Sequence, residues 1–259
     1  MAKTARRFLL LILVVICCSC DNGLFGTNLF ASFEKYDKPN IDTATSQELV
    51  TASRDSRFAQ SLTDEEVEKV NAKLKATYNS STASDKDKAQ AALLAGNVQF
   101  ENKGVNKSLG KINKIITNVL SGEPKDMNLE NVLQTIFDGE KKETVAKKIK
   151  ALLESADAYS AYGKVVNKVS VDKNPGDTAI QAFLSCGVAQ VMKLNPSLTP
   201  EKLAESITQK KIKDLKTPNY TEGASLKQNL TEALGNDQNA KNIVKVIEAG
   251  FDISKIKGD

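Results

Sequence analysis

The chain has 259 residues, with 36 Lys and Arg residues and 32 Asp and Glu residues, and it contains neither His nor Trp. The absence of His excludes Ser-His-Asp catalysis, zinc proteases of the H-E-x-x-H type and most general-base schemes that rely on imidazole. Neither G-x-x-x-x-G-K-[ST] nor G-x-G-x-x-G occurs. The composition therefore indicates a domain without the commonest catalytic or nucleotide-binding motifs.

The N-terminus has the layout of a secretory signal peptide. Three basic residues, Lys3, Arg6 and Arg7, precede the apolar run FLLLILVVI at residues 8–16, and this order is typical of targeting segments. As a helix the run would rise about 14 Å, which is too short for a hydrocarbon core of about 30 Å. We therefore expect residues 1–19 to direct export and then to be removed.

The apolar run is followed by Cys17, Cys18 and Cys20, and the small residue Ser19 stands directly before the last of them. This junction resembles the lipobox of bacterial lipoproteins, in which a cysteine follows a short apolar run and a small residue. The family prefers Leu where this chain has Cys17, and lipoproteins of spirochaetes often have such degenerate lipoboxes. The resemblance covers residues 1–21, and it implies cleavage after Ser19 and a diacylglyceryl thioether on Cys20.

Two other interpretations of the cysteine cluster stay open, namely an ordinary signal anchor and a redox or metal site. Cys17 and Cys20 form a C-x-x-C pair, but a zinc site needs about four ligands. The chain has no His and only one cysteine outside the cluster, Cys186. If Cys20 is lipidated, Cys186 has no disulfide partner, and its apolar surroundings predict a buried side chain.

Removal of residues 1–19 would also change the charge of the chain. The mature chain would keep 33 basic and 32 acidic side chains, a net charge of +1 instead of +4. Nucleic-acid-binding domains usually carry a surplus of Lys and Arg on one face. We therefore expect no nucleic acid among the partners.

Residues 20–44 are rich in Asn, Asp, Gly and Thr, and we interpret them as a lipidated tether. Within it, residues 29–36 could form a short helix whose aromatic side chains dock on the domain or lie at the membrane surface. From residue 45 onward the apolar residues recur at helical spacing, and no stretch alternates long enough to predict a strand. Residues 45–259 are therefore expected to form a single all-α domain.

The first helix predicted in this domain begins after Thr63, which forms a capping-box sequence with Glu66. Glycines punctuate the segments that follow, as expected at helix ends. The next predicted helices comprise residues 85–102, 107–121 and 129–138.

The longest helix is predicted at residues 141–169, where apolar residues recur in steps of four and three. This period favours antiparallel packing at a shallow angle, so we expect a hairpin with the next helix at residues 177–194. Five lysines are expected on the solvent side of the long helix. They are Lys141, Lys142, Lys147, Lys148 and Lys150.

The remaining helices are predicted at residues 200–216, 224–234 and 237–249. Thr199 and Pro200 begin the first of these as N-cap and N1 residues. The predicted architecture is a multi-helix bundle of antiparallel hairpins. Because the helices pair in units of roughly 35–45 residues, a degenerate helical-repeat array is the alternative.

One set of residues suggests where a ligand could bind. Tyr159, Tyr162, Phe183 and Cys186 would line an apolar cavity between the long helix and its neighbour, as in ligand-binding bundles. Aromatic residues at helical spacing more often belong to an ordinary packed core, which is the alternative interpretation of these residues. We expect no catalytic, cofactor-binding or metal-binding residues.

The function predicted from these observations is that of a non-catalytic lipoprotein of the bacterial cell envelope. Its lipid on Cys20 would hold the domain at a membrane, in the periplasm or at the cell surface. The domain would bind another envelope protein or a second copy of itself. The alternative is a helical bundle that binds an apolar small molecule or a lipid.

Overall fold

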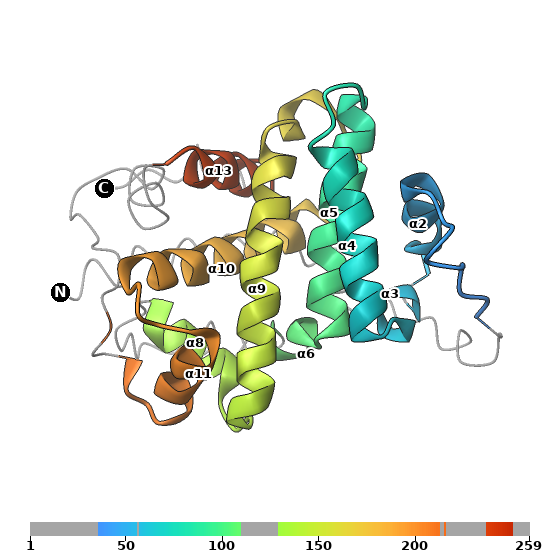
Figure 1. Cartoon of the computed structure of the whole chain (residues 1–259). Coiled ribbons are helices and arrows are strands. Elements are labelled where there is room, and N and C mark those ends of the chain that lie inside the picture. Colours follow the sequence, from blue (N-terminus) through green and yellow to red (C-terminus); the bar gives the residue numbers. More distant parts are fainter. Residues whose placement is uncertain (1–35, 56, 110–128, 213–214, 216–236, 251–259) are drawn as a thin grey trace.

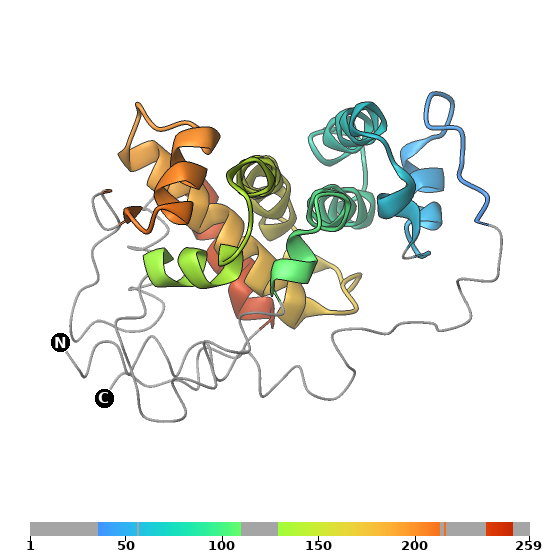
Figure 2. The ribbon, with the colours of Figure 1, turned by 90° about the horizontal axis from the view of Figure 1, so that it is seen from below.

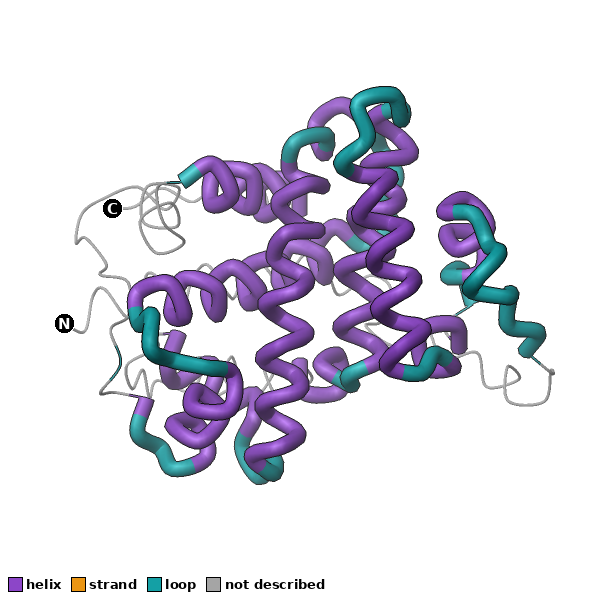
Figure 3. Tube along the Cα trace, viewed as in Figure 1, coloured by secondary structure: helices purple, strands orange, loops and turns teal. Residues whose placement is uncertain are grey.

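The structure is a computed structural model, and it describes residues 36–55, 57–109, 129–212, 215 and 237–250. These residues form helices joined by loops, without a strand among them (Figure 3). The predicted all-α fold is therefore confirmed. Cys20, most of the helix predicted at 107–121 and the one at 224–234 lie outside the described residues.

The helices are, in chain order, α2 (Ser46–Ala52), α3 (Arg57–Ser61), α4 (Asp64–Tyr78), α5 (Asp85–Asn102), α6 (Val105–Leu109), α8 (Leu129–Phe137), α9 (Lys142–Gly163), the 3₁₀ turn η1 (Val166–Lys168), α10 (Pro175–Leu194), α11 (Pro200–Thr208) and α13 (Gln238–Gly250). Figure 1 shows α4, α5 and α9 side by side, with α2 and α3 on the outer side of the α4–α5 pair. On the other side of α9, α10 and α13 run across it, and Figure 2 shows α8 and α11 on that same side.

Local sequence determines where several helices begin. At the start of α4, the Thr63 side chain accepts a hydrogen bond from the Glu66 N–H, and the Glu66 carboxylate accepts one from the Thr63 N–H at 2.8 Å. This confirms the predicted capping box. The same arrangement of Thr45 and Glu48 begins α2, and Thr199 caps α11 as predicted. Each cap satisfies N–H groups that have no partner within the helix.

The helix α5 is buried on more than one side. Leu93 and Phe100 belong to a core cluster that α5 shares with α9, α10 and α13. Leu94 and Val98 belong to a second cluster, which α5 shares with α2, α3 and α4. A helix that is apolar around most of its circumference is the kind found in a protein interior, so α5 joins the two halves of the core.

The long helix α9 is shorter than predicted, because it ends at Gly163 and not at residue 169. A Cβ atom at Gly163 would lie 2.1 Å from the backbone oxygen of Asn242 in α13. After this contact the chain leaves the α-helix, since the Val165 N–H bonds to the carbonyl of Tyr162 at 2.9 Å and η1 follows. The end of α9 thus lies where α13 crosses it.

The antiparallel hairpin expected for α9 and α10 is wrong. Figures 1 and 2 both show α10 running across α9. The apolar side of α9 is shared among several helices, because α5, α10, α11 and α13 all pack against α9. A single antiparallel neighbour therefore does not cover it. An antiparallel pair does occur between α4 and α5, which the loop at residues 79–84 joins (Figure 1).

Residues 36–45, which we call the N-terminal strap, lie against the domain, although most of them were assigned to the tether. Ile41 and Ala44 are buried in the second core cluster, together with side chains of α2 and α4. The Lys73 ammonium of α4 donates to the backbone carbonyls of Ile41, Asp42 and Ala44 at 2.8, 2.9 and 2.7 Å. The folded domain therefore includes residues before 45.

The first part of the strap is held by charged side chains. Lys38 Nζ lies 2.6 Å from a carboxylate oxygen of Glu66 at the start of α4. The guanidinium of Arg57 lies 5.3 Å from the ring centroid of Tyr36, a distance that suits a cation–π contact. The aromatic end of the segment predicted to dock at residues 29–36 thus packs on the domain, and the rest of that segment lies outside the described residues.

Candidate functional site

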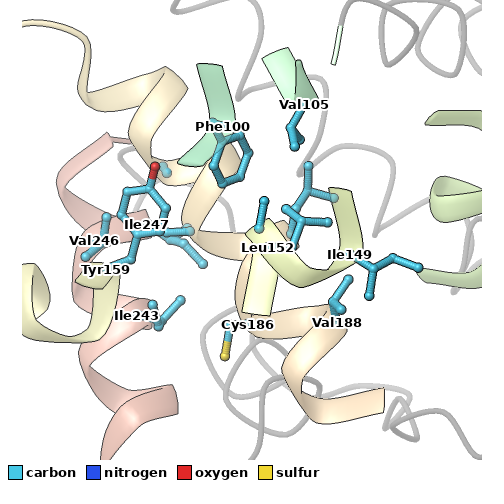
Figure 4. Packing of buried hydrophobic residues seen from close by; sticks show 14 of the residues in the cluster. Phe100, Val105, Ile149, Leu152, Tyr159, Cys186, Val188, Ile243, Val246 and Ile247 are labelled. Atoms are coloured by element: carbon cyan, nitrogen blue, oxygen red, sulfur yellow. The ribbon is translucent and has the colours of Figure 1, made fainter. Parts of the chain in front are cut away.

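Of the four residues expected to line a cavity, Tyr159 and Tyr162 lie on α9, and Phe183 and Cys186 lie on α10. Tyr159, Tyr162 and Cys186 are buried members of one core cluster, and the half-buried Phe183 packs against it. Figure 4 shows Tyr159 and Cys186 among the apolar side chains of this cluster. Their positions therefore match those of packed core residues.

Tyr159 fills the space that separates α9 from α5. Its ring packs edge-on to Phe100, with ring centroids 6.0 Å apart, which is a favourable arrangement for two aromatic rings. A Cβ atom at Gly96 of α5 would lie 2.5 Å from Cζ of Tyr159. The glycine therefore allows the ring to lie directly against the α5 backbone.

The Tyr159 hydroxyl belongs to a buried chain of hydrogen bonds. It donates to Gln181 Oε1 of α10 at 2.6 Å, and Gln181 Nε2 donates to Asn106 Oδ1 of α6 at 3.1 Å. Burial raises the pKa of Tyr159 well above its ordinary value, so the hydroxyl keeps its proton as a donor. This network joins α6, α9 and α10 and holds them in one arrangement.

Cys186 is 5% exposed, which confirms the predicted burial of its side chain. Burial, with a smaller contribution from the charge of Asp237, raises the pKa of the thiol to about 12. Because the thiolate is the reactive form, Cys186 is poorly suited to nucleophilic or redox chemistry at neutral pH.

A second polar cluster joins α6, α9 and the loop before α9. Lys148 Nζ of α9 lies 2.6 Å from Ser108 Oγ and 2.8 Å from the Glu140 carboxylate. Ser108 Oγ donates to the same carboxylate at 2.8 Å. The sequence placed Lys148 on the solvent side of the helix, and that prediction is wrong, because the residue is 7% exposed.

A serine beside a lysine raises the question of Ser-Lys chemistry. In such a pair the lysine removes the serine proton and must therefore be neutral. Here the Ser108 hydroxyl donates its hydrogen bond to Glu140. Lys148 forms an ion pair with the same carboxylate and is therefore no base for the serine. Ser108 is also only 1% exposed. The cluster is therefore suited to holding helices together and not to attacking a substrate.

An open groove of about 490 Å³ lies on the outer side of the α4–α5 pair. The end of the strap, the second half of α4 and the loop before α5 form its walls. Three alanines, Ala44, Ala76 and Ala83, contribute methyl groups to these walls, together with Lys73 and five Ser and Thr residues. No sequence pattern predicted the groove, because its residues are small and come from separate segments.

The polar groups around this groove already have partners. The hydroxyls of Ser46 and Thr77 lie 2.7 Å apart, and those of Ser80 and Thr82 lie 3.1 Å apart. The Lys73 ammonium bonds to the strap carbonyls as described above. What the groove offers to a ligand is therefore mainly methyl surface.

In the described part of the chain, no group of three or more Cys, Asp and Glu side chains is arranged to hold a metal ion. None of the helices in that part is long and apolar enough to cross a bilayer. Comparison of the chain with protein-family models, with curated proteins and with solved structures gave no match in any of the three.

Proposed function

We propose that the chain is a bacterial lipoprotein, anchored through Cys20, whose helical domain binds another protein of the cell envelope. One observation carries the proposal, namely the sequence order of basic residues, a short apolar run, Ser19 and Cys20. Cleavage after Ser19 would make Cys20 the first residue of the mature chain. The domain would then lie in the periplasm or at the cell surface.

The physical properties of lipid chains support an anchor of this kind. Each buried CH₂ group contributes about 0.8 kcal/mol, and a single acyl chain binds a membrane only marginally. The two chains of a diacylglyceryl group would hold the protein at the membrane stably. The domain begins by Tyr36, so residues 20–35 would separate the lipid from the domain.

A binding role for the domain is supported by the state of its reactive side chains. Ser108 and Lys148 are buried and bonded to each other, and Cys186 is a buried thiol with a raised pKa. We therefore assign no catalytic role to these groups. The partner is another envelope protein or a second copy of the chain.

Metabolic labelling with palmitate tests the anchor. The wild-type chain should take up label, and Cys20→Ala should lose it and accumulate as the uncleaved precursor. Cys17→Ala and Cys18→Ala are matched controls, because both cysteines precede the proposed cleavage site, and their mature products should keep the label. Equal labelling of wild type and Cys20→Ala would disprove the proposed attachment.

The partner is tested in the same cells with an amine-reactive crosslinker. Exposed lysines such as Lys147 and Lys150 on α9 provide reactive groups. The wild-type protein should form a crosslinked product of discrete mass, and mass spectrometry should identify its second component. Recovery of the monomer alone, at crosslinker concentrations that trap other envelope complexes, would contradict a binding function.

A further inference from the structure

The N-terminal strap is the part of the domain through which the chain leads back toward Cys20. It lies with α2 on the outer side of α4 (Figure 1). Of its ten residues, Ile41 and Ala44 are buried, and the others are half-buried or exposed. Segments with few buried apolar side chains and with solvent-exposed hydrogen bonds open locally at a lower free energy than a protein core does. The strap therefore has the properties of a segment that can detach before the helices behind it unfold.

Two lysines of α4 hold the second half of the strap. Lys69 Nζ lies 2.9 Å from the Asp42 carboxylate, but both side chains are exposed, and exposed ion pairs contribute little to stability. Lys73 instead donates to three backbone carbonyls, and two of them belong to the buried residues Ile41 and Ala44. Hydrogen bonds from a charged donor are stronger than those between neutral groups. Lys73 is therefore the side chain on which the docked position of the strap depends most.

We propose that the strap is a latch, held closed by Lys73, that opens as a unit while the rest of the domain stays folded. The helix behind it does not depend on the strap alone, because α4 also packs closely against α5. The strap adds Ile41 and Ala44 to the second core cluster, and most of the other members of that cluster come from α2, α3, α4 and α5. Opening would free ten residues, which span about 35 Å when fully extended.

The latch would control how far the domain can stand from the membrane, a consequence that rests on the proposed lipidation of Cys20. With the latch closed, residues 20–35 separate the lipid from the domain, and with the latch open, residues 20–45 do. A pull from the anchor reaches the contact between Lys38 and Glu66 before the bonds of Lys73, so the contacts can break one after another. The domain would then reach a more distant partner without unfolding.

Thiol labelling of the full chain in isolated membranes tests the latch. Ile41→Cys introduces a thiol at a buried position of the strap, and the native Cys186 in the other core cluster is the reference. The two positions are similarly buried, since Ile41 is 4% exposed and Cys186 is 5% exposed. A maleimide is added, and mass spectrometry of the peptides gives the labelling rate at each position. Lys73→Met is then introduced, with Lys75→Met as the matched control, because Lys75 is exposed on the same helix and pairs with Asp157 of α9.

We expect position 41 to be labelled at least ten times faster than Cys186. Lys73→Met should raise the rate at position 41 at least fivefold and leave the rate at Cys186 unchanged, and Lys75→Met should change neither rate. Equal rates at the two positions, an equal rise at both after Lys73→Met, or no rise at position 41 would overturn the proposal.

Hydrogen exchange measured by mass spectrometry tests the latch with Ile41 in place. In the docked strap, the N–H groups of Thr43 and Ala44 bond to the Asn40 carbonyl at 3.3 and 2.9 Å. In Lys73→Met, the amides of the strap should exchange at least threefold faster than in the wild type, while those of α9 keep their protection. Unchanged exchange in the strap, or an equal increase in α9, would contradict an opening that is confined to the strap.

The same labelling rates are expected after Cys20→Ala, because the contacts of the strap described above all lie within the domain. Equal palmitate labelling of the wild type and Cys20→Ala would disprove the anchor and leave the latch intact. Equal maleimide labelling at position 41 and at Cys186 would disprove the latch and leave the anchor intact. Failure of the lipidation and failure of the latch are therefore distinguishable.

Discussion

Among the charged residues that the structure describes, Lys148 is the one that falls in the buried class. Its ammonium, the Ser108 hydroxyl and the Glu140 carboxylate are joined by hydrogen bonds of 2.8 Å or less. Removing one member of a buried ion pair leaves a charge without compensation, which costs about 3–5 kcal/mol. Lys148→Met should therefore lower the free energy of unfolding by about that amount, measured from urea denaturation.

Two comparisons isolate the cause of this loss. Lys147→Met changes the exposed neighbour on α9 and should alter stability by less than about 0.5 kcal/mol. Adding Glu140→Gln to Lys148→Met removes the uncompensated charge and should recover more than half of the loss. A cost for Lys148→Met that matches that of Lys147→Met would show that the buried pair contributes little.

The error over Lys148 shows what periodicity cannot reveal about one residue. Lys148 adjoins Ile149 on the apolar side of α9, and lysines around it do point to solvent. Its burial depends on Ser108, which lies 40 positions earlier. By contrast, the burial of Cys186 followed from its apolar neighbours in the sequence.

At the scale of the helices, the end of α11 has an unusual backbone. Lys210 has a φ of +57°, a left-handed conformation that side chains with a Cβ atom adopt at a cost. The Lys211 N–H bonds to the Ser206 carbonyl at 2.7 Å, and the Lys210 N–H bonds to the Ile207 carbonyl at 3.1 Å. These two bonds define a Schellman motif, in which glycine is the usual residue at this position.

Lys210→Gly should therefore stabilise the domain by about 0.5–1 kcal/mol, visible as a higher denaturation midpoint in urea. Lys211→Gly is the control, because it replaces the next exposed lysine, which the structure does not place at positive φ. That change should give no gain. A midpoint for Lys210→Gly at or below that of the wild type would contradict the argument from strain.

Helix ends could be predicted from sequence where the cap is local. Thr63 with Glu66 and Thr199 with Pro200 began their helices as expected, because each cap lies within one turn. The helix at Lys210 was predicted to continue, since no glycine or proline interrupts the sequence there. Its early end depends on a left-handed lysine, which residue preferences argue against.

The arrangement of the whole molecule depends on contacts between residues that are distant in the sequence. The apolar pattern of α9 predicted one long seam and one antiparallel neighbour, whereas α5, α10, α11 and α13 share its surface. Periodicity identifies the apolar side of a helix but does not say how many helices cover it. The all-α class was therefore accessible from the sequence, and the crossing of α9 by α10 was not.

The crossing of α13 over the end of α9 gives this arrangement its most direct test. Gly163 lies against the backbone of Asn242, and a Cβ atom there would be 2.1 Å from a carbonyl oxygen that belongs to a helix. Because backbone cannot move aside as a flexible side chain can, Gly163→Ala should displace α13. Overpacking of this kind costs about 1–3 kcal/mol.

Hydrogen exchange measured by mass spectrometry distinguishes displacement of α13 from general destabilisation. In Gly163→Ala, the amides of α13 should exchange at least tenfold faster, while those of α4, which does not contact α13 closely, should keep their protection. Lys164→Ala introduces alanine at the next residue, which is exposed, and it should leave both helices protected. Unchanged exchange in α13 of Gly163→Ala would mean that α13 does not cross α9 at this glycine, because a Cβ atom has no space in the packing described above.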